Sequence, residues 1–350
     1  MFLHTSRSIG FRNLKPTLCH WHEGLNLLLG PNGAGKTNTL EVMHLISGWG
    51  SFQNQPPAAL LAPEASSVVV AGRVKGEEER EVQLTLWPRT DLKIDGHKAT
   101  WTSLRQNCPT LPFLPQDMQL IEGGPQVRRH FMDLLLTLLD PLHARRLAEL
   151  RKLCRMKKLF LAHHKPTSAI DRALTPVSVA LWRSREALVA ELERLFLSEG
   201  FCPLSLSLSL KRGGGGAAID PYEDYQAAFA RLGPKEREAK TLLFGPQRDD
   251  LEIKIGPALA RDRLSRGQRR RAALSLVLAA AHLVQSATGK KPLLLVDELA
   301  SELDSEGKDW VTAALVQSGC QVFAATAEWN RPWPGAVYTV DQGKVQEVKG

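Results

Sequence analysis

The order of apolar and polar positions predicts an α/β segment at the start of the chain. A short apolar run at residues 25–29 ends at a glycine, as a buried strand does, and residues 36–46 then have helical periodicity. Three further runs with strand character lie at residues 68–74, 81–86 and 92–94. Asp95-Gly96, directly after the last run, is typical of a two-residue hairpin turn.

The pattern changes after Pro125, where leucines recur at helical spacing on both sides of Pro141. A second amphipathic stretch covers residues 178–197, and residues 204–210 alternate Leu and Ser like a half-buried strand. The glycines at residues 213–216 predict a flexible turn or an exposed loop. The α/β pattern then returns, with helices expected at residues 266–286 and 307–317 and strands at 293–296 and 321–324. We therefore expect a split α/β domain, residues 1–124 and 244–350, that encloses a mainly helical insert, residues 125–243.

Composition limits the classes of protein that this chain can represent. Its 350 residues suffice for two domains, and its net charge of +8 favours an anionic partner such as a nucleic acid, a nucleotide or an acidic surface. The five cysteines show neither the spacing of a zinc site nor that of a disulfide framework. No segment approaches the roughly 18 apolar residues of a membrane span, so we expect a reduced, cytoplasmic protein without a membrane partner.

A glycine-rich segment between the first predicted strand and helix fits the phosphate-binding pattern G-x-x-x-x-G-K-[ST]. Its backbone N–H groups and the following helix N-terminus would surround the phosphates of ATP, with a lysine on the β and γ phosphates and a threonine on Mg²⁺. The predicted ATP-binding residues are Gly30, Pro31, Asn32, Gly33, Ala34, Gly35, Lys36, Thr37 and Asn38.

A second apolar strand ends in two acids, Asp297 and Glu298. Acids at strand ends are commonly plain surface residues, but together with the phosphate-binding loop they indicate a catalytic pair. We expect Asp297 to hold Mg²⁺, and Glu298 to act as the catalytic residue that accepts the proton of the attacking water.

Ser265-Arg266-Gly267-Gln268 precedes an apolar helix, where Ser265 could be an ordinary N-cap. The segment also resembles the signature sequence of ATP-binding-cassette ATPases, which grips the γ-phosphate bound to another subunit. Residues 301–304 are similar to the D-loop of that family, so the resemblance places Asp304 with the signature residues in the ATP site of the partner. It also places Gln116 in a magnesium-contacting Q-loop and leaves Thr326 where many members have a switch histidine.

Ser265 follows Lys36 by 229 positions, a separation too long for a simple transporter cassette and too short for the long coiled coil of SMC-type ATPases. Three stretches, residues 11–13, 113–117 and 245–251, together with the signature region, resemble the RecF family of recombination mediators over nearly the whole chain. Gln116 and Gln247 depart from the residues usual in that family.

The resemblance implies an α/β fold, an ATP-binding-cassette P-loop head with an inserted helical lobe. It further implies an ATP-dependent homodimer that holds duplex or gapped DNA and helps RecO and RecR to load RecA. It also suggests that Arg12 contacts the phosphates, although an arginine at a sheet edge is more often in a structural ion pair.

The predicted insert carries most of the positive charge, with eleven Lys or Arg against four Asp or Glu between residues 125 and 172. Lysines and arginines that face DNA phosphates provide much of the affinity for duplex, although a charge run can also be a simple solvated helix face. The residues expected to bind DNA are Arg145, Arg146, Arg151, Lys152, Arg155, Lys157 and Lys158.

Two other functions stay open at this point. The chain could be the ATPase subunit of a membrane transporter, although the long spacing and basic insert argue against that. It could also be a nucleotide-gated binding module that barely hydrolyses ATP, which a turnover measurement would distinguish.

Overall fold

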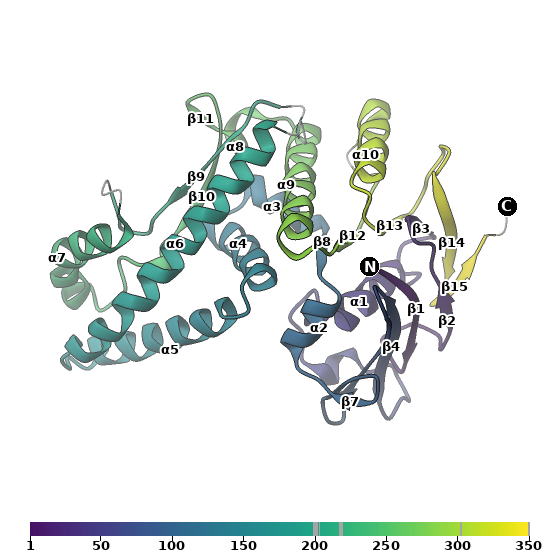
Figure 1. Cartoon of the computed structure of the whole chain (residues 1–350), viewed down its shortest axis with the longest axis horizontal. Helices are drawn as coiled ribbons and strands as arrows, with labels where there is room; N and C mark the ends of the chain where they lie inside the picture. The colour runs from purple at the N-terminus through teal and green to yellow at the C-terminus, as the bar shows by residue number, and fades with distance from the viewer. Residues whose placement is uncertain (199–201, 203, 217–219, 302, 349–350) are drawn as a thin grey trace. The chain divides into compact units, whose positions relative to one another are not determined.

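The computed structural model of the chain divides into two compact units (Figure 1). The head unit consists of Met1–Asp117 and Arg266–Gly350, and the insert unit is Met118–Ser265. The structure describes residues 1–198, 202, 204–216, 220–301 and 303–348. Among these residues, no helix combines the length and the apolar character needed to cross a bilayer.

The first sheet of the head unit is parallel except at one edge, in the order β15-β14-β3-β13-β12-β8. The strands are β3 (Leu25–Leu29), β8 (Thr110–Phe113), β12 (Leu293–Val296), β13 (Val322–Thr326), β14 (Gly335–Asp341) and β15 (Lys344–Glu347). Parallel strands end at the same edge, so the segments that follow β3, β12 and β13 come together there. This edge positions the site described below.

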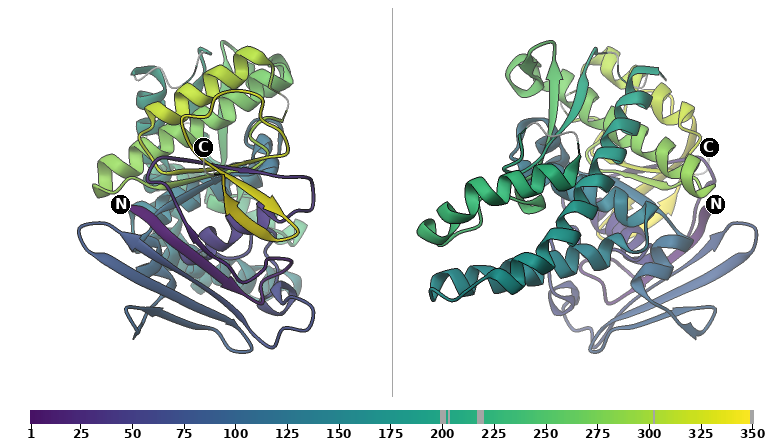
Figure 2. Two further views of the ribbon diagram at one scale, coloured as in Figure 1. Left: turned by 90° about the vertical axis from the view of Figure 1, so that its right-hand side faces the viewer. Right: turned by 60° about the vertical axis from the view of Figure 1, so that its left-hand side comes forward.

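The second sheet is antiparallel, in the order β2-β1-β4-β5-β6-β7, and its long strands are drawn in purple and blue in Figure 2. The strands are β1 (Phe2–Ile9), β2 (Leu18–His20), β4 (Val68–Lys75), β5 (Glu79–Trp87), β6 (Asp91–Ile94) and β7 (His97–Lys98). The turn between β6 and β7 is the expected Asp95-Gly96 pair, and both residues have positive φ, at 50° and 77°.

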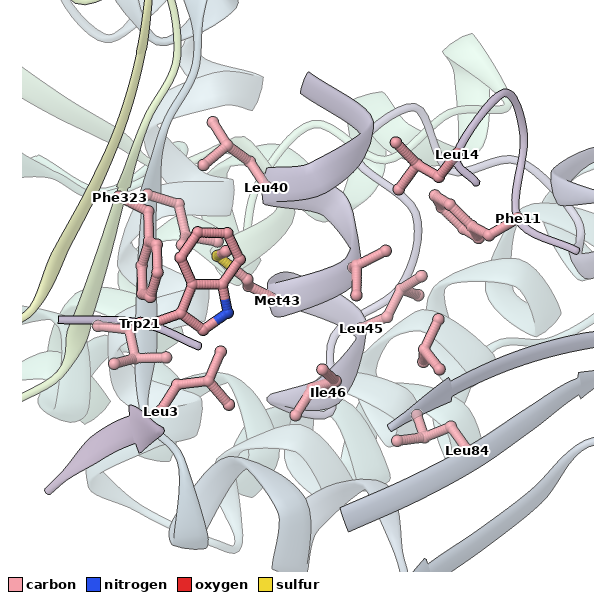
Figure 3. Packing of buried hydrophobic residues seen from close by; sticks show 14 of the residues in the cluster. Leu3, Phe11, Leu14, Trp21, Leu40, Met43, Leu45, Ile46, Leu84 and Phe323 are labelled. Atoms are coloured by element: carbon pink, nitrogen blue, oxygen red, sulfur yellow. The ribbon is translucent and has the colours of Figure 1, made fainter. Parts of the chain in front are cut away.

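Helix α1 (Lys36–Ile46) packs against strands of both sheets and forms the centre of the core (Figure 3). Met43 lies close to Trp21 and Phe323, whose rings meet edge to face with centroids 5.2 Å apart, while Ile46 lies toward Leu84. The helix is therefore held on several sides, which fixes the loop that precedes it. The other head helices are α2 (Trp101–Asn107), α9 (Arg266–Thr288), α10 (Ser305–Gln317) and the 3₁₀ turns η1 (Pro57–Leu60) and η2 (Pro115–Met118).

The insert unit combines long helices with a small antiparallel sheet, β11-β10-β9. Its helices are α3 (Gln119–Glu122), α4 (Pro125–Leu139), α5 (His143–Ala162), α6 (Ser168–Ser198), α7 (Pro221–Ala239) and α8 (Ala260–Arg263), with the 3₁₀ turn η3 (Pro246–Arg248). The strands are β9 (Ser207–Lys211), β10 (Asp250–Ile255) and β11 (Ala258–Leu259). Because β10 pairs with β9, the compact unit extends past the predicted boundary at residue 243 and ends at Ser265.

Asp249 organises the interior of the insert unit. Its fully buried carboxylate accepts hydrogen bonds from Arg185 at 2.6 Å, from the indole of Trp182 at 2.8 Å and from the Gly213 N–H at 2.8 Å. Burial raises the pKa of Asp249, an effect that Arg185 opposes. Residues 213 and 214 form a turn, one of the two alternatives predicted for this glycine segment, and Gly213 is buried in it.

Arg128 also serves the insert unit, because its guanidinium forms a two-pronged pair with Asp250 at 2.6 and 2.9 Å. The neighbouring Arg129 donates to the Asp249 carbonyl at 2.5 Å. The stretch at residues 245–251, part of the RecF resemblance, therefore has a structural role in this lobe.

Candidate functional site

The phosphate-binding loop, residues 30–37, connects β3 to α1 as the sequence predicted. Lys36 folds back over it, and its ammonium donates to the carbonyl oxygens of Gly30 at 2.7 Å and Pro31 at 2.9 Å. Gly35 has φ 116°, which other residues rarely adopt, and a Cβ on Gly30 would collide with the Val340 carbonyl oxygen. Both glycines are thus required by the local backbone.

A hydroxyl and a carboxylate meet between this loop and the end of β12. Thr37 Oγ1 donates to Asp297 Oδ2 at 2.7 Å, and Asp297 is almost completely buried. Both groups are hard oxygen donors of the kind that Mg²⁺ prefers when phosphates and water complete its shell. The pair fits a magnesium ion.

Hydrogen bonds fix the backbone of Glu298, and the residue is exposed. It has φ 51°, its N–H donates to Asp297 Oδ1 at 3.0 Å, and its carbonyl accepts from Arg270 of α9 at 2.6 Å. Arg270 is buried and lies 5.4 Å from the centroid of the Phe113 ring. These contacts fix the direction in which the Glu298 carboxylate leaves the strand end.

A pocket of about 670 Å³ opens over these groups. Residues after β3, β12 and β13 contribute to its wall, as the topology of the parallel sheet requires. The lining residues are Asn32, Gly33, Gly35, Lys36, Thr37, Asn38, Asp297, Glu298, Ala300, Ser301, Lys308, Thr326, Ala327 and Glu328. The site combines a loop rich in N–H donors, cations and carboxylates, which suits a magnesium-bound polyphosphate.

Burial and two nearby carboxylates affect the pKa of Lys36. Burial lowers the pKa of Lys36 from its ordinary value, while the nearby carboxylates of Asp297 and Glu298 act in the opposite direction. The two acids thus offset part of the cost of burying the ammonium.

The signature residues lie outside the lining of this pocket. Ser265, Arg266 and Gln268 are exposed and Gly267 is half-exposed where α9 begins. Their predicted contact with the nucleotide of a second subunit stays a prediction.

Asp304 has a local role in the head unit. It caps α10 by accepting from the Gly307 N–H at 2.7 Å, and it pairs with Arg271 at 3.2 Å. The backbone hydrogen bond from Gly307 and the nearby Arg271 lower the pKa of Asp304. Its predicted role in the ATP site of a partner stays a prediction, and Glu302 of the same segment lies outside the described residues.

Two predicted nucleotide contacts are not in the pocket wall. Arg12 forms an ion pair with the buried Glu41 at 2.7 Å and donates to Gln55 at 2.9 Å, which is the structural ion pair expected as its alternative. Gln116, in η2, is exposed and does not line the pocket.

Sequence reasoning missed two residues that shape the site. Asn13 donates to the Gly33 carbonyl at 3.0 Å and accepts from the Asn38 side chain at 2.7 Å, so it supports the loop from a distant segment. Arg270 lies near the start of the helix that follows the signature residues, and its backbone contact with Glu298 is visible only in the structure. Asn13 belongs to the stretch at residues 11–13 that resembles the RecF family, but the resemblance assigned it no role, and no periodic signal marks Arg270, which is buried.

The basic residues expected on the DNA-binding face separate into three groups. Arg146 pairs with Asp140 and is half-buried. The prediction for Lys157 is wrong, because this lysine is buried and neutralised by Asp171 at 2.8 Å and Glu236 at 2.5 Å, so its ammonium cannot reach a DNA phosphate. The exposed residues of the set are Arg145, Arg151, Lys152, Arg155 and Lys158 of α5.

The chain matches the family described as RecF/RecN/SMC N terminal domain over residues 2–331. The DNA replication and repair protein RecF of Pseudomonas paraeruginosa is 31% identical over 96% of this chain and 95% of its own length. RecF of Pseudomonas fluorescens strain SBW25 is 29% identical over 96% of both.

Solved structures share the fold. One described as the recombination mediator protein RecF with ATP in the RecFOR pathway has a TM-score of 0.84, at 23% identity, and covers 99% of this chain and 98% of its own. An Smc head bound to the C-winged helix domain of ScpA has a TM-score of 0.59, at 16% identity, over 99% and 97%. The chain therefore belongs to the RecF family of DNA replication and repair proteins, with the α/β head of the SMC-like and ATP-binding-cassette ATPases.

Proposed function

We propose that this protein is an ATP-dependent DNA-binding protein of recombinational repair. Two copies close on two ATP molecules and hold duplex or gapped DNA, and slow ATP hydrolysis separates them again. Each half of the shared site lies on a different copy, so the binding of nucleotide is an assembly step.

The observation that carries this proposal is the separation of the two groups of nucleotide motifs. The pocket at the sheet edge gathers the loop, Thr37, Asp297 and Glu298, whereas the exposed residues 265–268 do not line it. A second copy that brings its residues 265–268 to this pocket would supply the missing wall over the γ-phosphate.

The residues of this chain have distinct proposed tasks. The loop N–H groups and Lys36 bind the phosphates, which requires the Lys36 ammonium to exchange the carbonyls of Gly30 and Pro31 for phosphate oxygens. Thr37 and Asp297 hold Mg²⁺, which neutralises charge on the phosphates. Glu298 accepts the proton of the water that attacks the γ-phosphorus, and ADP leaves with the electrons of the broken bond.

Arg12 and Gln116 are not included in this proposed set, because Arg12 is paired with Glu41 and neither lines the pocket. Asp304 is included only in the site of the partner. Its cap on α10 fixes the segment that would meet the other copy.

The exposed basic side chains of α5 are the proposed DNA contacts, through phosphates and without base readout. The proposal also includes cooperation with RecO, RecR and RecA and a place in the cytoplasm. A solved RecF relative is described as a recombination mediator protein in the RecFOR pathway. We extend that role to this chain on family membership.

Sedimentation velocity with ATP, with ADP and without nucleotide tests the proposal. Wild type should be dimeric with ATP and Mg²⁺ and mainly monomeric otherwise. Ser265→Arg should still bind ATP, because its own phosphate-binding loop is intact, but should stay monomeric. Ser66→Arg, on an exposed loop of the head unit, is the matched control and should dimerise. Dimerisation of Ser265→Arg with ATP would overturn the shared site.

A further inference from the structure

A second lysine lines the pocket that holds the phosphate-binding loop. Lys308 lies in the first turn of α10 and lines the same pocket as Glu298 and Ser301. The phosphate-binding motif does not include it. The pocket lining therefore includes two lysines, Lys36 from the loop and Lys308 from α10.

The backbone that carries Lys308 is firmly positioned. Asp304 caps the helix through the Gly307 N–H, and the Lys308 N–H donates to the Asp304 carbonyl at 3.0 Å. Arg331, from the loop that follows β13, binds both Asp309 and the hydroxyl of Ser305. The lysine thus extends from a fixed stem, which lowers the entropy lost when its ammonium binds a ligand.

The ammonium of Lys308 has no competing partner in the part of the chain that the structure describes. It is half-buried, and no described carboxylate forms an ion pair with it. The carboxylate of Asp297 already accepts from Thr37 and from the Glu298 N–H. Lys308 is therefore a cation without an ion-pair partner among the described residues, in the lining of a pocket suited to an anion.

Thr326, at the position of the switch histidine, is a poor candidate for binding the γ-phosphate. A phosphate oxygen is an acceptor and requires a donor, but the Thr326 hydroxyl donates to the Glu328 carbonyl at 3.2 Å. Its only hydrogen is thus used inside its own turn.

We propose that Lys308 binds the γ-phosphate and makes the site discriminate ATP from ADP, in place of a switch histidine. The proposal rests on the proposed ATP site. Glu298, the residue placed to accept the proton of the attacking water, shares its wall with Lys308, so the terminal phosphate is the one that reaches this end of the pocket. The α and β phosphates lie toward the loop and the start of α1.

Equilibrium binding of ATPγS and of ADP, each with MgCl₂, tests this assignment without relying on turnover. Lys308→Met should weaken ATPγS binding about ten- to a hundredfold, the range for a lost charge-assisted hydrogen bond, and change ADP affinity less than about twofold. Lys308→Arg should recover most of the ATPγS affinity, because it restores the charge. Thr326→Val should change neither affinity more than about twofold.

Lys98→Met, an exposed lysine of β7 in the same unit, is the matched control and should bind both nucleotides like wild type. Equal loss of ATPγS and ADP affinity in Lys308→Met would show that the lysine attracts any nucleotide by its charge and does not recognise the γ-phosphate. No loss of either affinity would show that it does not contact the nucleotide. Either result overturns the inference. If wild type binds neither nucleotide, the proposed ATP site itself fails, which is a different outcome.

Discussion

Lys157 and Lys158 are neighbours on α5 with opposite environments, because consecutive helix positions point about 100° apart. Lys157 is buried with Asp171 and Glu236, and its ammonium lies 5.0 Å from the centroid of the Phe244 ring. Lys158 is exposed. A charge count along the sequence treats the two as equal, and only the packing of α5 separates them.

This pair yields a prediction with its own control. Lys157→Met leaves two buried carboxylates without a cation, and we expect the free energy of unfolding to fall by about 3–5 kcal/mol. Lys158→Met should change it by less than about 0.5 kcal/mol but weaken DNA binding. Urea denaturation and DNA titration on both variants check this. If the Lys157→Met protein is as stable as wild type but binds DNA more weakly, then Lys157 does contact DNA.

Arg270 is expected to position Glu298 without touching nucleotide. Arg270→Gln has a shorter, uncharged side chain that should not reach the Glu298 carbonyl, so the carboxylate should lose its direction and kcat should fall about tenfold or more. The KM for ATP should stay within about twofold, because the phosphate contacts are untouched.

Leu278→Ala, a buried position on the same helix, is the control for this variant. It should destabilise the protein by about 2–5 kcal/mol and leave kcat of the folded enzyme near that of wild type. If Arg270→Gln raises KM and leaves kcat unchanged, the arginine is not a positioning residue.

At the scale of elements, sequence periodicity was most successful where helices and strands are bounded by strong local signals. Helix α1 has the predicted bounds, since a glycine-rich loop precedes it and its apolar face is packed between two sheets. In contrast, α6 was predicted to begin after Pro176 but begins at Ser168. Its stripe of buried residues, which includes Leu174 and Leu181, continues through the proline, so tertiary packing overrides the local preference.

Helix α7 was not predicted, because Gly233-Pro234 is typical of a turn. Its start does carry a signal, since Asp220 accepts from the N–H groups of Tyr222 and Glu223 and Pro221 is the first helical residue. The residues of the site differ in the same way in how far the sequence predicts them. Contiguous motifs could be predicted, whereas Asn13, Arg270 and Lys308 reach it from segments that only the fold brings together.

The exposed face of α5 as a whole supports a prediction on DNA affinity. Replacing Arg151, Arg155 and Lys158 by Ala removes three phosphate contacts, so the slope of log K against log salt should become shallower by about 2 to 3. Binding should weaken alike on different duplex sequences.

The control replaces three exposed basic residues of the head unit, Arg73, Lys98 and Lys344. This variant has the same change in net charge, so an unchanged slope would show that the position of the charges matters and not only their sum. If the two triple variants change the salt slope equally, the basic face of α5 is an ordinary solvated surface and does not bind DNA.

At the scale of the whole molecule, the proposed function makes hydrolysis the step that ends DNA binding. Glu298→Gln keeps a side chain of similar size but cannot accept a proton from water, so ATP binding and dimerisation should persist while turnover falls by about a hundredfold or more. The dimer should then stay on DNA longer, and wild type with ATPγS should behave in the same way.

Dissociation of labelled duplex DNA, measured after dilution into excess unlabelled DNA, checks this prediction. The rate for Glu298→Gln with ATP should be about as slow as for wild type with ATPγS, and both should be much slower than wild type with ATP. Ser265→Arg, which binds ATP without closing the dimer, should release DNA quickly under every condition. If Glu298→Gln releases DNA at the wild-type rate while its turnover is lost, then hydrolysis does not set the residence time, and the nucleotide-gated binding module becomes the better description of the molecule.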